Sequence, residues 1–299
     1  MIHKVALNIY NKAWLIEPQS AMNLITLWEK IMNNETTWRA EQEDTNQGYR
    51  NIQKLFAKSD IAFAPDNVWD AKNFTGFDGA SVAVIPVNGP LMKGDFCGWF
   101  GTAKLSQMVS LADRTPSVKS IVLLVDSPGG TVDGTSSFAD TVKRSSKQTI
   151  SVVDGMACSA AYWIASSANE MYATSKTDIV GSIGTMVSWR DNSKFLEQEY
   201  GIVSREYYAT KSVDKNRAFN EANNGDGRML IQEMLDPMNN EFLGAVKANR
   251  AEKLDLQQED VLTGKTYLGS AAKQYGLIDG ITTFDKAIQK SLSQAKTIK

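Results

Sequence analysis

The sequence predicts an α/β protein built around a mostly parallel β-sheet. Between about residue 80 and residue 180, short apolar segments that read as strands alternate with segments of helical periodicity. The apolar run at 120–126 is continuous, which is typical of a strand buried on both faces of a sheet. Strands that alternate with helices indicate crossover units and parallel pairing. The 299 residues are enough to bury a large core without disulfide bonds.

The central elements follow one another with clear boundaries. Each strand ends at a turn rich in glycine, proline or asparagine, such as Asn88-Gly89-Pro90 after the first strand. In chain order we expect a strand at 81–87, a helix at 104–112, a strand at 120–126, a helix at 136–144, a strand at 149–154, a helix at 159–168, and short extended segments at 171–173 and near 179.

The two ends of the chain differ from this central region. Residues 1–45 carry a weak helical pattern, and 33–75 are polar, so we expect a loosely packed arm or linker there, with a short helix near 52–56. A long helix is expected beyond residue 228, followed by short mixed elements. The predicted division is an N-terminal extension at 1–78, a main domain at 79–290 and a tail at 291–299.

Composition and charge exclude several classes of protein. The 32 basic and 34 acidic residues give a net charge of −2, which does not favour nucleic acid or an anionic membrane as a partner. No apolar run approaches the length of about 20 residues that a membrane-spanning helix needs. Polar residues near the N-terminus interrupt any signal-peptide pattern. We therefore expect a cytoplasmic protein without a membrane anchor.

The chain contains one histidine, His3, and two cysteines, Cys97 and Cys158. This composition argues against a Ser-His-Asp triad, a Cys-His dyad, a histidine-based metal centre and a disulfide framework. We expect no metal and no cofactor. With no histidine to activate it, Cys158 is interpreted as a small packing residue, whereas Cys97 lies in an aromatic loop that could line a groove or simply pack.

Two strand-to-helix junctions are the candidates for chemistry. The first, 126–130, ends in Pro128-Gly129-Gly130, where glycines let the backbone approach a ligand and direct amides at an anion. The same motif is also compatible with a plain crossover turn. The second junction places Ser159 at the start of a helix among small residues, where helix amides can stabilise an oxyanion. The alternative is an ordinary helix-capping serine.

Segment 81–285 resembles the signal peptide peptidase A family of serine peptidases. The resemblance rests on four motifs in the family's order and spacing: Ser127-Pro128-Gly129-Gly130, Ala157-Cys158-Ser159-Ala160-Ala161-Tyr162, Gly181-Ser182-Ile183-Gly184 and Tyr275-Gly276-Leu277-Ile278-Asp279. It implies the Clp/crotonase-like fold of repeated ββα units, here with an N-terminal extension that is mostly helical or loosely ordered. It also implies a homo-oligomer, in which neighbouring subunits can complete one another's active sites.

The resemblance also assigns roles to residues. Ser159 corresponds to the nucleophile, and Ser182 to a serine that positions the general base. Amides at Gly129, Gly130 and Ala160 correspond to the oxyanion hole. Two alanines follow Ser159 where many members have two glycines. This difference keeps the backbone donors and narrows the pocket, so it affects specificity more than mechanism.

The family's general base is a lysine, for which this chain offers two candidates. Lys211, preceded by small residues and followed by a serine, matches the family's pattern better than Lys215. For both, a solvated surface lysine is the alternative interpretation. A lysine base must lose about 2–3 units from its ordinary pKa of about 10.4, which desolvation can supply if oligomerisation closes the site.

These expectations combine into a serine endopeptidase that works through a Ser/Lys dyad and an acyl-enzyme. The opening segment resembles phage-encoded members of the family, so phage scaffold or capsid proteins are the expected substrates, in the host cytoplasm or prohead. A soluble signal-peptide-peptidase-like protease is the second expectation. Two alternatives stay open, namely a crotonase-like acyl-CoA enzyme and a non-catalytic oligomeric scaffold. Cleavage preference and subunit number are not determined by the sequence.

Overall fold

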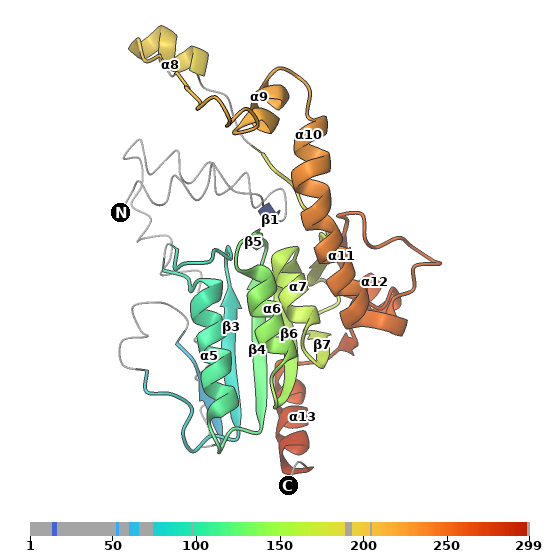
Figure 1. The fold of residues 1–299 in the computed structure, drawn as a ribbon. Coiled ribbons are helices and arrows are strands. Elements are labelled where there is room, and N and C mark those ends of the chain that lie inside the picture. The colour runs from blue at the N-terminus through green and yellow to red at the C-terminus, as the bar shows by residue number, and fades with distance from the viewer. Residues whose placement is uncertain are drawn as a thin grey trace.

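Parallel strands form the main sheet of the computed structural model, which describes residues 14–16, 52–53, 60–65, 74–96, 98–188, 193–203 and 205–297 (Figure 1). Its principal strands lie in the order β10-β7-β6-β4-β3-β2, and each neighbouring pair is parallel. Their bounds are Ile61–Phe63 for β2, Val82–Asn88 for β3, Ser120–Ser127 for β4, Gln148–Cys158 for β6, Glu170–Ala173 for β7 and Gly280–Ile281 for β10.

Helices cover both faces of this sheet, so its central strands are apolar on both sides. On one face lie α5 (Thr102–Arg114), α6 (Thr135–Lys143) and α7 (Ala160–Ser166), and on the other lies α13 (Phe284–Thr297). Alternate residues of β4 face opposite layers, as Ile121 and Leu123 join the first core and Val122 and Leu124 the second. This explains the continuous apolar run at 120–126.

Several core strands are followed by a short second extended segment before the helix. After β3, Leu91 makes a parallel bridge with Gly130 of β5 (Gly129–Thr131), which itself follows β4. The end of β6 pairs with β8 (Ile179–Gly181), and β8 pairs antiparallel with β9 (Thr266–Leu268), which leads into α12 (Gly269–Gln274). The predicted α/β fold of repeated ββα units is confirmed.

The central elements agree with the sequence prediction to within a few residues, except that β6 extends four residues past the predicted end at 154. The extra length comes from a bulge, where the register of β4 and β6 shifts between Val125 and Ser127. The structure adds β2, inside the segment expected to be a linker, as a partner of β3. Helix α13 continues across the predicted boundary at 291. The expected helical pattern at 1–45 lies outside the described residues, apart from 14–16, which form a strand. In the aromatic loop around Cys97, Cys97 itself lies outside them.

The long helix expected beyond residue 228 is present but is not uniformly α-helical. It runs through α10 (Arg228–Leu230), a π-helical segment (Ile231–Leu235) and α11 (Asp236–Arg250). Phe242 of α11 stacks on Trp163 of α7, with ring centroids 4.9 Å apart, and so fixes α11 on the main body. Among the described helices, none combines the length and apolarity needed to cross a bilayer.

A projecting segment connects the sheet to this long helix. It carries α8 (Ser193–Tyr200) and α9 (Arg217–Asn223), which lie beyond the end of the sheet in Figure 1. We call the described residues 193–203 and 205–223 the arm. Several large apolar side chains of the arm are exposed, among them Tyr207 at 88% and Val213 at 72%.

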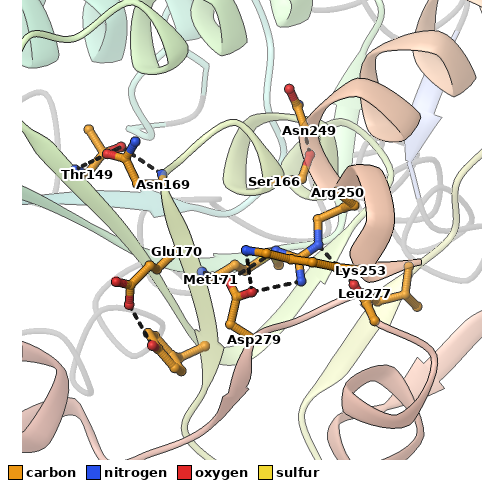
Figure 2. Close-up of polar contacts among 12 residues, drawn as sticks. Thr149, Ser166, Asn169, Glu170, Met171, Asn249, Arg250, Lys253, Leu277 and Asp279 are labelled. Atoms are coloured by element: carbon orange, nitrogen blue, oxygen red, sulfur yellow. Dashed lines mark hydrogen bonds and ion pairs between the residues drawn. The ribbon is translucent and has the colours of Figure 1, made fainter. Parts of the chain in front are cut away.

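A buried ion pair ties the end of α11 to the last family motif (Figure 2). Arg250, only 2% exposed, bonds both carboxylate oxygens of Asp279 and also donates to the carbonyl of Gly276. Lys253 and the amide of Met171 also donate to Asp279. Burial alone raises the pKa of Asp279, but these hydrogen bonds outweigh it and hold the pKa below its ordinary value.

Removing the acidic partner should therefore be far more costly than removing the exposed basic one. We expect Asp279→Ala to lower the free energy of unfolding by about 3–5 kcal/mol, because Arg250 is left buried without a counter-charge. The control is Lys253→Ala, which removes a half-exposed lysine and should cost about 1 kcal/mol or less. Urea unfolding of both variants measures the difference, and equal losses would contradict this account.

Candidate active site

Ser159 lies at the sharp junction between β6 and α7. Its backbone has φ 55° and ψ −118°, a conformation that side-chain-bearing residues rarely adopt. The amide of Ser159 donates to the carbonyl of Gly181 over 2.8 Å, and its carbonyl accepts from the amide of Trp163, the first bond of the helix. The hydroxyl lies 3.5 Å from the carbonyl oxygen of Gly184. Neighbouring backbone thus holds Ser159 in a strained and fixed geometry.

The Gly181–Gly184 motif lies directly beside this serine. The register of β6 and β8 pairs Cys158 with Gly181, so Ser182 follows at the same end of the sheet as Ser159. Ser182 also has a positive φ, 53°, and its amide donates to the carbonyl of Lys265 over 2.8 Å. The structure therefore brings together two motifs that are more than twenty residues apart in sequence.

The glycine motif forms the short strand β5, which contacts α7. The carbonyl of Gly129 and the amide of Thr131 both bond Leu91 over 2.8 Å. Because successive residues of a strand point their polar groups to opposite edges, the amide and carbonyl of Gly130 point to the other edge. Any side chain at Gly130 would clash, since its Cβ would lie 1.7 Å from the carbonyl oxygen of Leu91. Gly129, in contrast, donates its amide to the Ser127 hydroxyl.

An N-terminal strand, β1 (Trp14–Ile16), occupies that other edge of β5. The two strands are antiparallel, and Leu15 lies opposite Gly130. The sequence pattern does not predict this pairing, since 14–16 fall in a segment expected to be helical or loosely ordered. No local signal could have revealed it, because the partner strand lies more than a hundred residues away in sequence.

A cavity of about 390 Å³ adjoins the Gly181–Gly184 motif. Its walls come from five parts of the chain, namely β1, the Gly181–Gly184 motif, the π-helical segment, α11 and the loop before β9. Most of the side chains are apolar, and the lining includes Ile16, Ser182, Ile183, Met186, Ile231, Leu235, Asn239 and Leu262. The side chain of Asn239 fixes one wall by accepting a hydrogen bond from the amide of Thr185. The arrangement can receive an apolar side chain.

Both candidate lysines lie on the arm, away from this cluster. Lys211 and Lys215 are exposed, and neither lines the cavity beside Ser182. Lys215 instead lines a separate hollow on the arm together with Glu206 and Tyr207. Within one subunit the structure therefore assembles the serine and glycine motifs and leaves the lysines apart from them.

The remaining reactive groups near the glycine motif have structural partners. Asp126 accepts from the amide of Met156 at the β6 bulge, and Asp133 forms an ion pair with Lys93. Cys158 is buried at 0% exposure, as expected for a packing residue. Desolvation by the surrounding protein raises the pKa of Asp126 to about 6, with smaller contributions from the nearby carboxylates of Asp154 and Asp178.

Comparison with known proteins places the chain in a family. Residues 141–299, about half of the chain, match the sequence profile of peptidase family S49. The chain belongs to this family. The S49 match contains Ser159, the Gly181–Gly184 motif, both candidate lysines and the Asp279 cluster. Three of the four motifs that carry the resemblance to signal peptide peptidase A lie inside this match, and the resemblance is thereby confirmed.

Individual relatives share fewer than a third of the aligned residues with this chain. Protease 4 of Salmonella typhi is 28% identical over 224 residues, which are 73% of this chain and 35% of that protein. Capsid assembly protease C of Escherichia phage lambda is 27% identical over 79% of this chain and 54% of its own length. The chain thus spans about a third and about half of these two relatives. A membrane-bound stomatin-specific protease, solved with a substrate peptide, is 14% identical with a TM-score of 0.46, covering 73% of this chain and 81% of that one.

The strained backbone of Ser159 gives a prediction about stability. Ser159→Gly and Ser159→Ala both remove the hydroxyl, but only glycine adopts a positive φ without strain. We expect the glycine variant to be more stable than the alanine variant by about 1 kcal/mol, the lower end of the cost of such a conformation. Thermal unfolding of the two proteins measures the difference. A less stable glycine variant would show that the Ser159 backbone is not strained.

Asp126 gives a prediction about pH. Its pKa is higher in the folded chain, near 6, than the value of about 3.9 expected in the unfolded chain. Stability from this group is therefore complete below about pH 4 and is lost as the pH rises through 6. Asp126→Asn keeps an oxygen acceptor for the Met156 amide and removes this loss. Its melting temperature should exceed that of the wild type at pH 7 but not at pH 4, and a constant difference across that range would contradict the assignment.

Proposed function

We propose that this chain is a serine endopeptidase in which Ser159 is the nucleophile and Lys211 the general base. Membership of peptidase family S49 supports peptidase activity. The observation that carries the assignment is the position of Ser159, at a strained strand-to-helix junction between the glycine strand β5 and the Gly181–Gly184 motif. A nucleophile needs this kind of fixed placement beside amide donors.

The proposed reaction begins when the Ser159 hydroxyl attacks the carbonyl carbon of a peptide bond. The lysine takes the hydroxyl proton, and the carbonyl oxygen becomes an oxyanion. The intermediate then collapses, the C–N bond breaks, and the lysine returns the proton to the leaving amine. An ester to Ser159 remains, and water hydrolyses it by the same steps in the second half of the cycle. By the family resemblance, Ser182 positions the lysine.

The amides of Gly130 and Ala160 are the proposed oxyanion donors. Ala160 is the first residue of α7, where amide groups have no partner within the helix. Gly130 points its amide to the edge of β5 that does not face Leu91, whereas the amide of Gly129 is already bonded to the Ser127 hydroxyl. Gly129 therefore serves better as the residue that turns the chain than as a donor.

We propose further that the lysine acts from a neighbouring subunit. Within its own chain Lys211 is exposed on the projecting arm (Figure 1), and a base of this type needs desolvation to lower its pKa. The arm exposes Phe195, Tyr207 and Val213, which is unusual for a surface that faces only water. A second copy that covers these side chains would bury the lysine and complete the site at the same time.

The proposed substrates are polypeptides, and phage scaffold or capsid proteins are the first candidates. The name of the lambda relative, a capsid assembly protease, supports this choice. The host cytoplasm or the prohead would then be the site of action. An acyl-CoA reaction is less well supported, because Asp126 and Asp133, the carboxylates nearest the glycine motif in sequence, have structural partners.

Cleavage of casein between pH 6 and pH 10, followed by mass spectrometry, tests the dyad. Ser159→Ala should abolish cleavage, and Lys211→Ala should lower the rate by at least about a thousandfold, as expected for a unit whose parts act together. Lys215→Ala is the matched control, since this lysine lies four residues further along the same arm, and it should retain activity. Loss of activity in Lys215→Ala alone would reassign the base. Cleavage that persists in Ser159→Ala would reject the proposal.

Co-expression of the two inactive variants tests whether the lysine comes from a neighbour. If it does, a site formed by Ser159 of a Lys211→Ala subunit and Lys211 of a Ser159→Ala subunit is complete. Random mixing in equal amounts then restores roughly a quarter of the wild-type rate, because a heterologous contact combines two independent subunits. If the lysine acts within its own chain, every mixed oligomer stays inactive.

A further inference from the structure

The pairing of β1 with β5 points to a role for the N-terminal strand. A polypeptide commonly binds a protein by adding an extended strand to a free sheet edge, where main-chain hydrogen bonds hold it. The edge of β5 that does not face Leu91 can receive such a strand, and β5 contacts α7, whose N-cap is Ser159. In this structure Trp14–Ile16 fill that edge as an antiparallel strand.

The register places this strand over the proposed oxyanion donor. Leu15 lies opposite Gly130, and the amide of Gly130 points toward β1 because its neighbours on either side bond Leu91. In an antiparallel ladder, residues opposed in this way exchange amide and carbonyl bonds. The main chain of Leu15 therefore uses the amide that a substrate carbonyl would need.

The next residue of the strand also occupies space near the site. Ile16 is 2% exposed and lines the same cavity as Ser182 and Gly184. Ser159 itself is buried at 0% exposure. A main chain over the donor amide and an apolar side chain in the adjacent cavity are the two features expected of a bound substrate segment.

We propose that residues 14–16 occupy the polypeptide-binding groove of this chain as a substrate-like strand and inhibit the peptidase until they are displaced. This inference rests on the proposed function, because it needs Gly130 and Ser159 to belong to the active site. The inhibitor is part of the same chain, and three residues pair it with β5. A substrate segment that makes the same main-chain bonds and places an apolar side chain in the cavity can therefore compete with it.

A disulfide that locks β1 onto β5 tests the proposal directly. Trp14 lies opposite Thr131 and is one residue from the Leu15 and Gly130 pair, so it forms a non-hydrogen-bonded pair with a Cα separation of about 4.5 Å. This separation suits a disulfide. We expect Trp14→Cys/Thr131→Cys, when oxidised, to cleave casein no faster than Ser159→Ala. Dithiothreitol should restore cleavage, and the single variant Trp14→Cys, treated with the same oxidant, is the control.

A second variant releases the strand without a covalent change. Ile16→Asp places a charge in the apolar cavity and should raise the initial rate, by about tenfold if the paired form is near 90% of the molecules. Leu111→Asp is the matched control, since Leu111 lies on the surface of α5 at 36% exposure, and its rate should equal that of the wild type.

The outcomes separate the two proposals. Mass spectrometry verifies the disulfide between residues 14 and 131. If Ser159-dependent cleavage is unchanged when this disulfide has formed, inhibition by β1 is rejected and the proposed function stands. An unchanged rate in Ile16→Asp would count against inhibition in the same way. If neither the wild type nor the Ile16→Asp variant cleaves casein above the level of Ser159→Ala, the proposed function fails and the inhibition proposal fails with it.

Discussion

The backbone of Ser159 is the constraint on which the rest of the site depends. A positive φ at a non-glycine residue is unfavourable, so the fold must hold it from several sides. The carbonyl of Gly181 accepts a hydrogen bond from the Ser159 amide, and the Ser159 carbonyl accepts the first hydrogen bond of α7. Helix α7 is itself fixed by the stacking of Trp163 on Phe242 of α11. The ion pair of Arg250 with Asp279 then anchors the end of α11 to the strand region around Met171. Elements far from the serine thus stabilise its geometry.

The two edges of the glycine strand β5 bond different parts of the chain: one edge bonds Leu91 and the other pairs with β1. One edge bonds Leu91 so closely that Gly130 cannot carry a side chain. Because the edge that faces Leu91 is held in place, the Gly130 amide points to the opposite edge, where β1 lies. The proposed oxyanion donor and the edge that binds β1 both follow from this geometry, so the proposed catalysis and the proposed inhibition depend on one close backbone contact.

The arm contrasts with this rigid body in its polarity and burial. Its side chains include exposed aromatic residues such as Tyr207, and both candidate lysines are exposed there. In the body, the half-buried carboxylate of Asp279 is paired with the buried guanidinium of Arg250. A lysine that must lose its charge to act as a base needs an apolar environment, and the arm obtains one only when something covers it. On the proposed mechanism, assembly completes the base, whereas β1 of the same chain controls access to Ser159.

The sequence by itself determined the α/β class, the order of the central elements and the two junctions at 127–130 and 159, because these are set by local apolar patterns and by glycine and small residues at strand ends. It also argued against a histidine base, since His3 is the only histidine, and the family resemblance pointed to a lysine. Only the tertiary structure decided that Ser159 and Ser182 lie together, and that the Gly130 amide rather than the Gly129 amide points to the edge of β5 where β1 lies. Strand pairing between residues 15 and 130 leaves no periodic signal in either segment, because main-chain hydrogen bonds carry no side-chain pattern.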